Sequence, residues 1–434
     1  TGNYAKKVDI EMNWSKLSIL LCGALFLTGC FSSQNHDPQK EKHETIRLLG
    51  TVGVHEMIVE LIEDELANAG IKIEKNFFYW DTYMAKARQA IMNETGEYDI
   101  IMGPNCVLSR FMRSGKLIAL NDLAEQAGLF PDDLYPQILN SIIFEDKWYS
   151  LPYLADVLIY IYRHDLFIPI ETTPPKSITQ MYEIAQLMTT DSIYGCAFPA
   201  NPDDPVTSVW SYFLWSFGGD YFTNDWHPII NSSQSVAATR IYSLFLENCA
   251  PSAVATWKTE EAVDFFTGGN LAAMIIWSST LPVINNSEKK VTGKIGCAPL
   301  PFGPTDNAIS PFASWGMVIP RSARHIIAAK KFALSLVSIN TFRTIAESGM
   351  APTPLPKINQ EYAKKDPDKP LAIATKALDE AKIRPYLLEA NQYIPIINSV
   401  LNDILMGADA KTTLEETNKQ IRLLMKAGGY EQNY

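Results

Sequence analysis

The sequence predicts an α/β protein built from two lobes. Three short apolar or alternating runs, at residues 46–49, 71–74 and 98–102, are separated by two stretches of helical periodicity, near 58–69 and 83–93. This β-α-β-α-β order favours a mainly parallel sheet with crossover helices. Residues 45–434 also exceed the size of one typical hydrophobic core, so we expect two lobes.

The N-terminal segment has the pattern of an export signal. The first methionine is Met12, so residues 1–11 are set aside from the fold, and residues 17–27 form an apolar run preceded by a lysine. This run is shorter than the roughly 20 residues of a membrane span. It ends in residues 27–30, LTGC, which resemble a bacterial lipobox and imply cleavage before Cys30 and acylation of that cysteine. The alternative is an uncleaved N-terminal anchor.

We therefore expect residues 1–29 to be an upstream segment and signal peptide, and residues 30–44 to be a polar tether. The protein would be exported and held on a membrane by the lipid, at its periplasmic or extracellular face. Phe31 follows the cysteine and leaves open which membrane carries the anchor.

Composition excludes several classes of function. The formal net charge is −11 with a pI of about 5.2, and the part after the tether has no basic run, which argues against nucleic acid as a partner. No second apolar stretch is long enough to span a membrane. Four widely spaced cysteines, at 106, 196, 249 and 297, form no CxxC motif, and the six histidines have no ligand spacing. We expect no metal and no cofactor, and the disulfide state stays open.

The remaining chain adds further elements. The near-continuous apolar run at 148–163 predicts a buried strand, and further strands are expected in 265–279 and 295–302. Helices are predicted near 178–189, at 323–338 with Ser322 as N-cap, and at 412–426 with Thr412 and Glu415 as a capping box.

Four segments, in this order and spacing, resemble one protein family. They are residues 109–123 (SRFMRSGKLIALNDL), 149–167 (YSLPYLADVLIYIYRHDLF), 264–280 (DFFTGGNLAAMIIWSST) and 311–333 (PFASWGMVIPRSARHIIAAKKFA). Together they resemble the extracellular solute-binding proteins of ATP-driven importers, in the maltose-binding-like sugar branch. The resemblance covers nearly all of residues 45–427.

The resemblance implies a type II periplasmic-binding-protein fold, in which two α/β lobes joined by three hinge crossings close over a solute. The crossings are expected at 153–157, 297–302 and 350–355. Lobe 1 would comprise residues 45–153 and 303–350, and lobe 2 residues 154–298 and 355–434. The implied partners are a small solute, most simply a carbohydrate, and ABC permease subunits. The protein would act as a monomer.

A sugar site needs aromatic rings for the apolar sugar faces and carboxylates or amides for the hydroxyl groups. Asp156 lies in an apolar strand, where a carboxylate is costly unless bonded, and it matches a family position that contacts sugar. The alternative is a hinge residue bonded to backbone amides. Trp315 matches a position of stacking aromatics in the family, and Trp277 ends a predicted strand; core packing is the alternative for both.

Strand ends supply the other candidates. Trp80, Asp81 and Asn105 follow the second and third predicted strands, where open sheets bind ligands, and His55 lies in a neighbouring loop. Most aromatics of 209–226 have helical spacing and are expected in the core, with Trp210 as the one candidate for the site. Arg384 either reaches the site or pairs with an acidic residue.

Two other classes of function stay open at this stage. A secreted glycosidase-like enzyme needs only a suitably spaced carboxylate pair, although no GxSxG, HExxH, P-loop or GxGxxG motif occurs. A binding protein for a polyamine, a glycerol phosphate or a similar solute would have the same fold, and a purely structural lipoprotein would not need loop-borne tryptophans.

Overall fold

A computed structural model describes residues 44–202, 204–286, 290–385 and 390–430. Cys30, the predicted signal peptide and residues 30–43 of the predicted tether lie outside the described residues, and Glu44, the last residue of that predicted tether, begins the first strand. No helix in the described ranges is long and apolar enough to cross a membrane. The four cysteines that these ranges contain, at 106, 196, 249 and 297, carry free thiols.

The chain begins with the predicted β-α-β-α-β order. Its elements are β1 (Glu44–Thr51), α1 (Val54–Asn68), β2 (Ile71–Phe78), α2 (Trp80–Met92) and β3 (Ile100–Pro104). Strand β1 pairs in parallel with both β2 and β3, as expected for crossover helices. Helix α1 buries Ile58, Ile62 and Leu66 on one face, and it ends before Gly70, which has a φ of 75°. The order of elements is therefore confirmed.

The rest of the sheet is antiparallel, so the prediction of a mainly parallel sheet holds only for these three strands. Strand β9 (Phe312–Val318) pairs antiparallel with β3 and with β6 (Leu151–Arg163). Strands β7 (Ala273–Trp277) and β8 (Ile295–Ala298) pair antiparallel with β6. The order of strands is β2-β1-β3-β9-β6-β7, with β8 also on β6.

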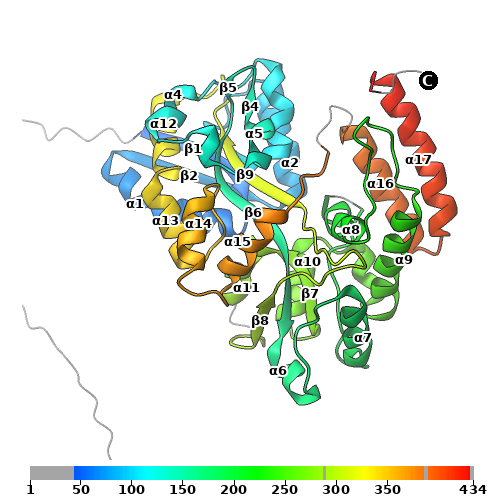
Figure 1. Ribbon diagram of the computed structural model, residues 1–434. Helices are drawn as coiled ribbons and strands as arrows, with labels where there is room; N and C mark the ends of the chain where they lie inside the picture. The colour runs from blue at the N-terminus through cyan, green and yellow to red at the C-terminus, as the bar shows by residue number, and fades with distance from the viewer. Residues whose placement is uncertain (1–43, 203, 287–289, 386–389, 431–434) are drawn as a thin grey trace, which may run out of the picture. The chain divides into compact units, whose positions relative to one another are not determined.

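Strand β6 joins two groups of strands. Its first half pairs with β9 as far as Val157, and its second half pairs with β7 from Leu158 onward. The register shifts between Pro152 and Leu154, at a proline that has no backbone N–H to donate to the ladder. Figure 1 shows β6 as a single long strand that runs from the β9 side of the sheet to β7 and β8. The partner changes between Val157 and Leu158, at the end of the first predicted crossing, 153–157.

Helices and short elements cover these strands. Figure 1 places α1, α12 and α13 together and α8, α9, α16 and α17 together, and the tertiary contacts agree. The remaining elements are α3 (Asn105–Leu108), α4 (Asn121–Gln126), α5 (Pro136–Ile142), β4 (Ile143–Phe144), β5 (Lys147–Trp148), α6 (His164–Phe167), α7 (Ile178–Met188), α8 (Asp204–Ser216), α9 (Ser233–Asn248), α10 (Thr259–Thr267), α11 (Leu281–Asn285), α12 (Ile326–Leu336), α13 (Ile339–Ser348), α14 (Pro356–Ala363), α15 (Pro370–Glu380), α16 (Ala390–Leu405) and α17 (Ala410–Ala427), with 3₁₀ turns η1 (Ser109–Ser114), η2 (Pro131–Asp133), η3 (Ile168–Ile170), η4 (Ser252–Thr256) and η5 (Ser278–Thr280).

Helix α14 packs against α13 and bonds to the part of the chain assigned to lobe 1. The Asn359 amide donates to the Tyr135 hydroxyl at 3.2 Å, and Lys357 forms an ion pair with Asp133 at 2.7 Å. After α15, the backbone of Lys382 exchanges hydrogen bonds with Ser310 and Phe312. The predicted lobe boundaries stay a prediction. They assign α14 to lobe 2, whereas its contacts are with residues assigned to lobe 1.

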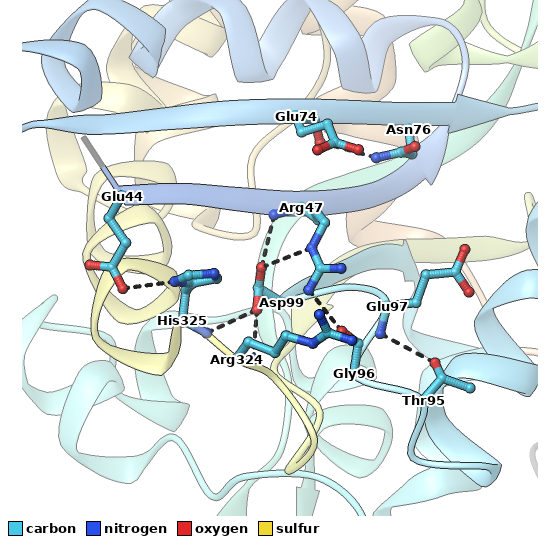
Figure 2. Close-up of polar contacts among 10 residues, drawn as sticks. All are labelled: Glu44, Arg47, Glu74, Asn76, Thr95, Gly96, Glu97, Asp99, Arg324 and His325. Atoms are coloured by element: carbon cyan, nitrogen blue, oxygen red, sulfur yellow. Dashed lines mark hydrogen bonds and ion pairs between the residues drawn. The ribbon is translucent and has the colours of Figure 1, made fainter. Parts of the chain in front are cut away.

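The segment just before α12 is bonded to a carboxylate that is distant in the sequence. The helix begins at Ile326, and its N-cap residue His325 makes no side-chain cap bond, so the prediction of Ser322 as N-cap is wrong. The buried carboxylate of Asp99 instead accepts hydrogen bonds from the backbone N–H groups of Arg324 (2.7 Å) and His325 (3.0 Å). It also accepts from the backbone N–H of Arg47 at 2.9 Å (Figure 2). One carboxylate thus joins β1, the segment before β3 and the helix start.

Helix α17 starts earlier than predicted. The side chain of Asp409 accepts from the backbone N–H of Thr412 at 2.9 Å, so Asp409 and not Thr412 is the N-cap. Both residues are good caps in sequence, and the structure uses the first of them.

Candidate ligand-binding cavity

A cavity of about 550 Å³ opens where β1, β2 and β3 end. Its lining comes from residues 51–57, 79–80, 104 and 106, from 258–260, 263–264, 277, 279–280, 283 and 286, and from 156, 313, 315 and 384. The carboxyl ends of parallel strands are where open α/β sheets bind ligands. The volume lies in the range of roughly 300–1,000 Å³ that small-molecule sites occupy.

One side of the cavity, here named the first wall, is aromatic. It consists of His55 at the start of α1, Trp80 at the start of α2 and Trp315 in β9. The ring centroids of His55 and Trp315 are 4.0 Å apart with an interplanar angle of 37°, and Trp80 meets Trp315 edge-on at 6.4 Å. Trp80 and Trp315 are half-buried, so part of each side chain stays accessible, and both line the cavity. The first wall therefore offers flat apolar surface to a ligand.

A buried hydrogen bond fixes the histidine of this wall. Its Nδ1 lies 2.8 Å from the hydroxyl oxygen of Tyr153 in β6. His55 is 5% exposed, and burial lowers the pKa of its imidazole to about 3. The imidazole is therefore neutral at physiological pH.

Asp156 lies at the join between the two halves of β6 and lines the cavity. Its carboxylate accepts from the Ser278 hydroxyl (2.6 Å), from both the backbone N–H (3.1 Å) and the hydroxyl (2.6 Å) of Ser279, and from the Val157 N–H (3.0 Å). Burial raises the pKa of Asp156 to about 6, and the four hydrogen bonds oppose that shift. Asp156 thus lines the cavity while its carboxylate is bonded within the chain, and its contact with a solute stays a prediction.

Another part of the lining, here named the second wall, carries charge. It consists of Lys258 and Glu260 at the start of α10 and Trp277 at the end of β7. Lys258 forms an ion pair with Asp81 of α2, and this hydrogen bond holds the pKa of the lysine above its ordinary value. Burial raises the pKa of the Glu260 carboxyl. The ion pair links the second wall to α2, the helix that begins with Trp80 of the first wall.

The structure brings four of the predicted ligand contacts into one lining, namely Asp156, Trp315, Trp277 and Trp80. Asp81 is outside the lining and binds Lys258, which is part of it. Asn105 is fully buried, with its amide N–H donating to Ser314 at 3.0 Å and its amide oxygen accepting from Ser150 at 2.7 Å.

Trp210 is also fully buried and outside the lining. Its indole N–H donates to the Thr239 hydroxyl at 2.9 Å, and its ring packs edge-on against Tyr221. Both Asn105 and Trp210 thus have their polar groups bonded within the chain.

The sequence did not single out several lining residues. Lys258, Glu260 and Ser279 carried no signal, because neither a helix start nor a Ser-Ser pair marks a site by itself. The sequence predicts His55 only as part of a pocket loop and predicts for Arg384 either a place in the site or a pairing with an acidic residue; both residues are buried and line the cavity. Within the described ranges, no group of three or more His, Cys, Asp or Glu side chains is arranged to hold a metal ion.

Comparison with known proteins decides the family. Residues 58–338 match the family of bacterial extracellular solute-binding proteins. The chain belongs to this family. Among its relatives, a probable amino-acid ABC transporter periplasmic-binding protein of Sinorhizobium fredii is 22% identical over 413 residues, which are 91% of this chain and 92% of that protein. The mannitol-binding protein of Pseudomonas aeruginosa is 25% identical over 271 residues, 61% of this chain and 62% of the relative.

Solved structures of solute-binding proteins share the fold. Maltose-bound MalE3 of T. maritima has a TM-score of 0.76 at 19% identity, with 88% of this chain and 99% of that chain covered. A solute-binding protein of Thermotoga lettingae with bound α-D-tagatose has a TM-score of 0.78 at 18% identity, with 88% and 100% covered. One from Agrobacterium vitis with D-mannitol has a TM-score of 0.76 at 19% identity, with 89% and 100% covered. The predicted two-lobe, type II fold of this solute-binding protein is confirmed.

Proposed function

We propose that this solute-binding protein serves an ABC importer and captures an uncharged sugar or polyol in the cavity. The observation that carries the proposal is the set of three tryptophans, at 80, 277 and 315, around one cavity that also contains Asp156 and Glu260. Aromatic faces stack on the apolar faces of sugars, and carboxylates accept hydrogen bonds from their hydroxyl groups. Relatives crystallised with maltose, tagatose or mannitol support this solute class.

Capture would involve lobe closure about the long strand β6. We infer a third crossing near Lys382, where the backbone bonds to Ser310 and Phe312, because α14 packs with lobe 1 elements. A solute that touches both walls binds the closed form better than the open form, and this differential affinity shifts the equilibrium toward closure. The closed monomer would then deliver the solute to permease subunits.

Binding without turnover separates this proposal from an enzyme. Titration of the purified protein with maltose and with D-mannitol, followed by tryptophan fluorescence, should give a saturable change with at least one of them. Chromatography of the mixture should return the sugar unchanged. Saturation only with spermidine or glycerol 3-phosphate, or release of a product, would contradict the proposal.

We also propose that Cys30 is lipidated and anchors the exported protein to a membrane. The support is the sequence alone, with the apolar run at 17–27 followed by LTGC at 27–30. The full chain expressed in a bacterial host should incorporate labelled palmitate and fractionate with membranes. The Cys30→Ser variant should lose both properties, and label that persists in the variant would contradict this assignment.

A further inference from the structure

His55 has an unusual position for a polar side chain, because it lies between the aromatic first wall and a buried tyrosine. Its ring contacts Trp315 at a centroid distance of 4.0 Å and meets Tyr153 edge-on at 5.9 Å. The side chain is almost completely buried, yet it contributes to the cavity lining. A polar group in such a place needs partners for both ring nitrogens.

The partner of Nδ1 determines where the ring proton sits. Nδ1 and the Tyr153 hydroxyl are 2.8 Å apart, and no other hydrogen bond of that hydroxyl is found among the described residues. If Nδ1 carried the proton, the tyrosine O–H, which is fully buried, would have no acceptor. If the tyrosine donates to Nδ1, its proton is satisfied and the imidazole proton lies on Nε2. The second arrangement leaves no buried donor without a partner.

Nε2 is the nitrogen that is left over. It has no hydrogen-bond partner in the described part of the chain. The described side-chain polar atoms that lack a partner and are inaccessible to solvent are Thr51 Oγ1, Tyr83 Oη, Gln137 Oε1, Tyr242 Oη and Ser243 Oγ. Nε2 of His55 is not one of them. Nε2 therefore reaches open space, and the open space that His55 adjoins is the cavity.

We propose that His55 is a ligand-binding residue whose Nε2–H donates a hydrogen bond to an oxygen acceptor of the solute, with Tyr153 as the positioning residue that fixes this tautomer. The solute part of this assignment rests on the proposed function. The low pKa of His55 agrees with it, because a neutral imidazole presents one donor and no charge. A donor here complements the carboxylates, which only accept, so the site can bind a hydroxyl group in both directions.

The tautomer can be read without any ligand. In ¹⁵N-labelled protein, long-range proton–nitrogen NMR spectra should show a protonated Nε2 and an unprotonated Nδ1 for His55 between pH 5 and 8. The Tyr153→Phe variant, which removes only the hydroxyl, should lose this preference. A ring protonated on Nδ1 in the native protein overturns the proposal.

The contact with the solute is tested by two amides of different length. Asn at position 55 keeps a polar atom near the Tyr153 hydroxyl but has none at the Nε2 position, whereas Gln places an amide N–H there. With whichever of maltose and D-mannitol binds the native protein, His55→Asn should bind about tenfold more weakly, the worth of one neutral hydrogen bond. His55→Gln should stay closer to the native affinity, and circular-dichroism melts check that both variants fold.

Equal sugar affinities of the two amide variants overturn the donor role. So does a ¹⁵N chemical shift of His55 Nε2 that stays the same when the native protein is saturated with the sugar. A native protein that binds neither sugar contradicts the proposed function instead, while the spectra of the free protein still decide the tautomer. The two failures are therefore distinguishable.

Discussion

The two walls of the cavity are built by different means. The first wall holds its rings on the ends of the sheet, where Trp315 is fixed by the pairing of β9 and His55 by a buried hydrogen bond. The second wall takes Lys258 and Glu260 from the start of helix α10, where Lys258 forms an ion pair with the exposed Asp81. A wall on sheet ends presents preorganised apolar surface, whereas a wall of long charged side chains adapts as the solute arrives.

The difference suggests an order of binding. Stacking on a rigid ring loses little conformational entropy, so we expect the first wall to supply most of the affinity. The second wall would form hydrogen bonds with the solute as the two lobes close. Asp156 stands between the two, because it belongs to the strand that joins the halves of the sheet and bonds to Ser278 and Ser279 beyond β7. Three sets of variants test these separate roles.

The largest expected effect concerns Asp156 and the stability of the join. Its pKa of about 6 in the folded protein exceeds the ordinary value of 3.8. Between pH 4 and 6 the carboxyl group of Asp156 therefore holds a proton in the folded protein and has lost it in the unfolded chain. This group's contribution to the free energy of unfolding is therefore highest below pH 4 and falls by about 3 kcal/mol as the pH rises through 6.

The Asp156→Asn variant should lose this part of the pH dependence. Its amide oxygen can keep the three bonds to Oδ1, and its N–H can donate to the Ser279 hydroxyl in place of the bond that Oδ2 accepts. Urea unfolding at pH 4.5 and pH 7.5 gives the difference between native protein and variant, in which the other carboxyl groups cancel. Equal pH dependence of the two proteins would show that Asp156 is ionised throughout.

The second effect compares the walls directly. Trp315→Ala should weaken sugar binding by about 2 kcal/mol or more, roughly thirtyfold, as loss of a buried aromatic anchor does. Trp277→Ala on the second wall should cost less, and Trp315→Phe should recover part of the loss. Calorimetric titration of the three variants gives the order, with Trp226→Phe as a control outside the lining. A larger loss for Trp277→Ala would reverse the roles of the walls.

Much of the fold follows from local sequence patterns, since periodicity and turn residues act within a few positions. The alternation of strands and helices up to β3 and the long apolar strand β6 could be predicted in this way. The helix start at Ile326 could not, because the backbone N–H groups of Arg324 and His325 just before it bond to Asp99, more than 200 residues away. Likewise, the antiparallel β9 pairs with β3 across most of the chain, and nothing near residue 315 in the sequence reveals its partner.

The residues of the candidate site likewise differ in whether a local sequence pattern could predict them. Trp80, Trp277 and Trp315 could be proposed because each stands at a strand end or before a glycine, where side chains meet a cleft. Trp210 lies on α8, which is buried around Trp210, Phe213 and Leu214, so its spacing did not tell a cavity face from a core face.

Asn105 follows β3 as a ligand residue would, yet its amide is bonded to Ser150 and Ser314, which lie 45 and 209 residues away in the sequence. The pairing of His55 with Tyr153 spans 98 residues and is equally invisible to a local pattern.

The smallest expected effect concerns the ion pair between Lys258 and Asp81. Lys258→Met, Asp81→Asn and the double variant form a cycle whose coupling energy for sugar binding should be about 0.5 kcal/mol, because exposed pairs contribute little. The coupling should fade in 1 M salt, where screening acts over about 3 Å.

The pair of Lys330 with Asp122 provides a matched control, since its side chains are 33% and 60% exposed, as are those of Lys258 and Asp81. Because Lys330 and Asp122 are outside the cavity lining, the same substitutions there should leave sugar affinity unchanged. Equal coupling in both cycles would mean that the Lys258–Asp81 contact does not report closure of the walls, and the second wall would then act through Glu260 and Trp277 alone.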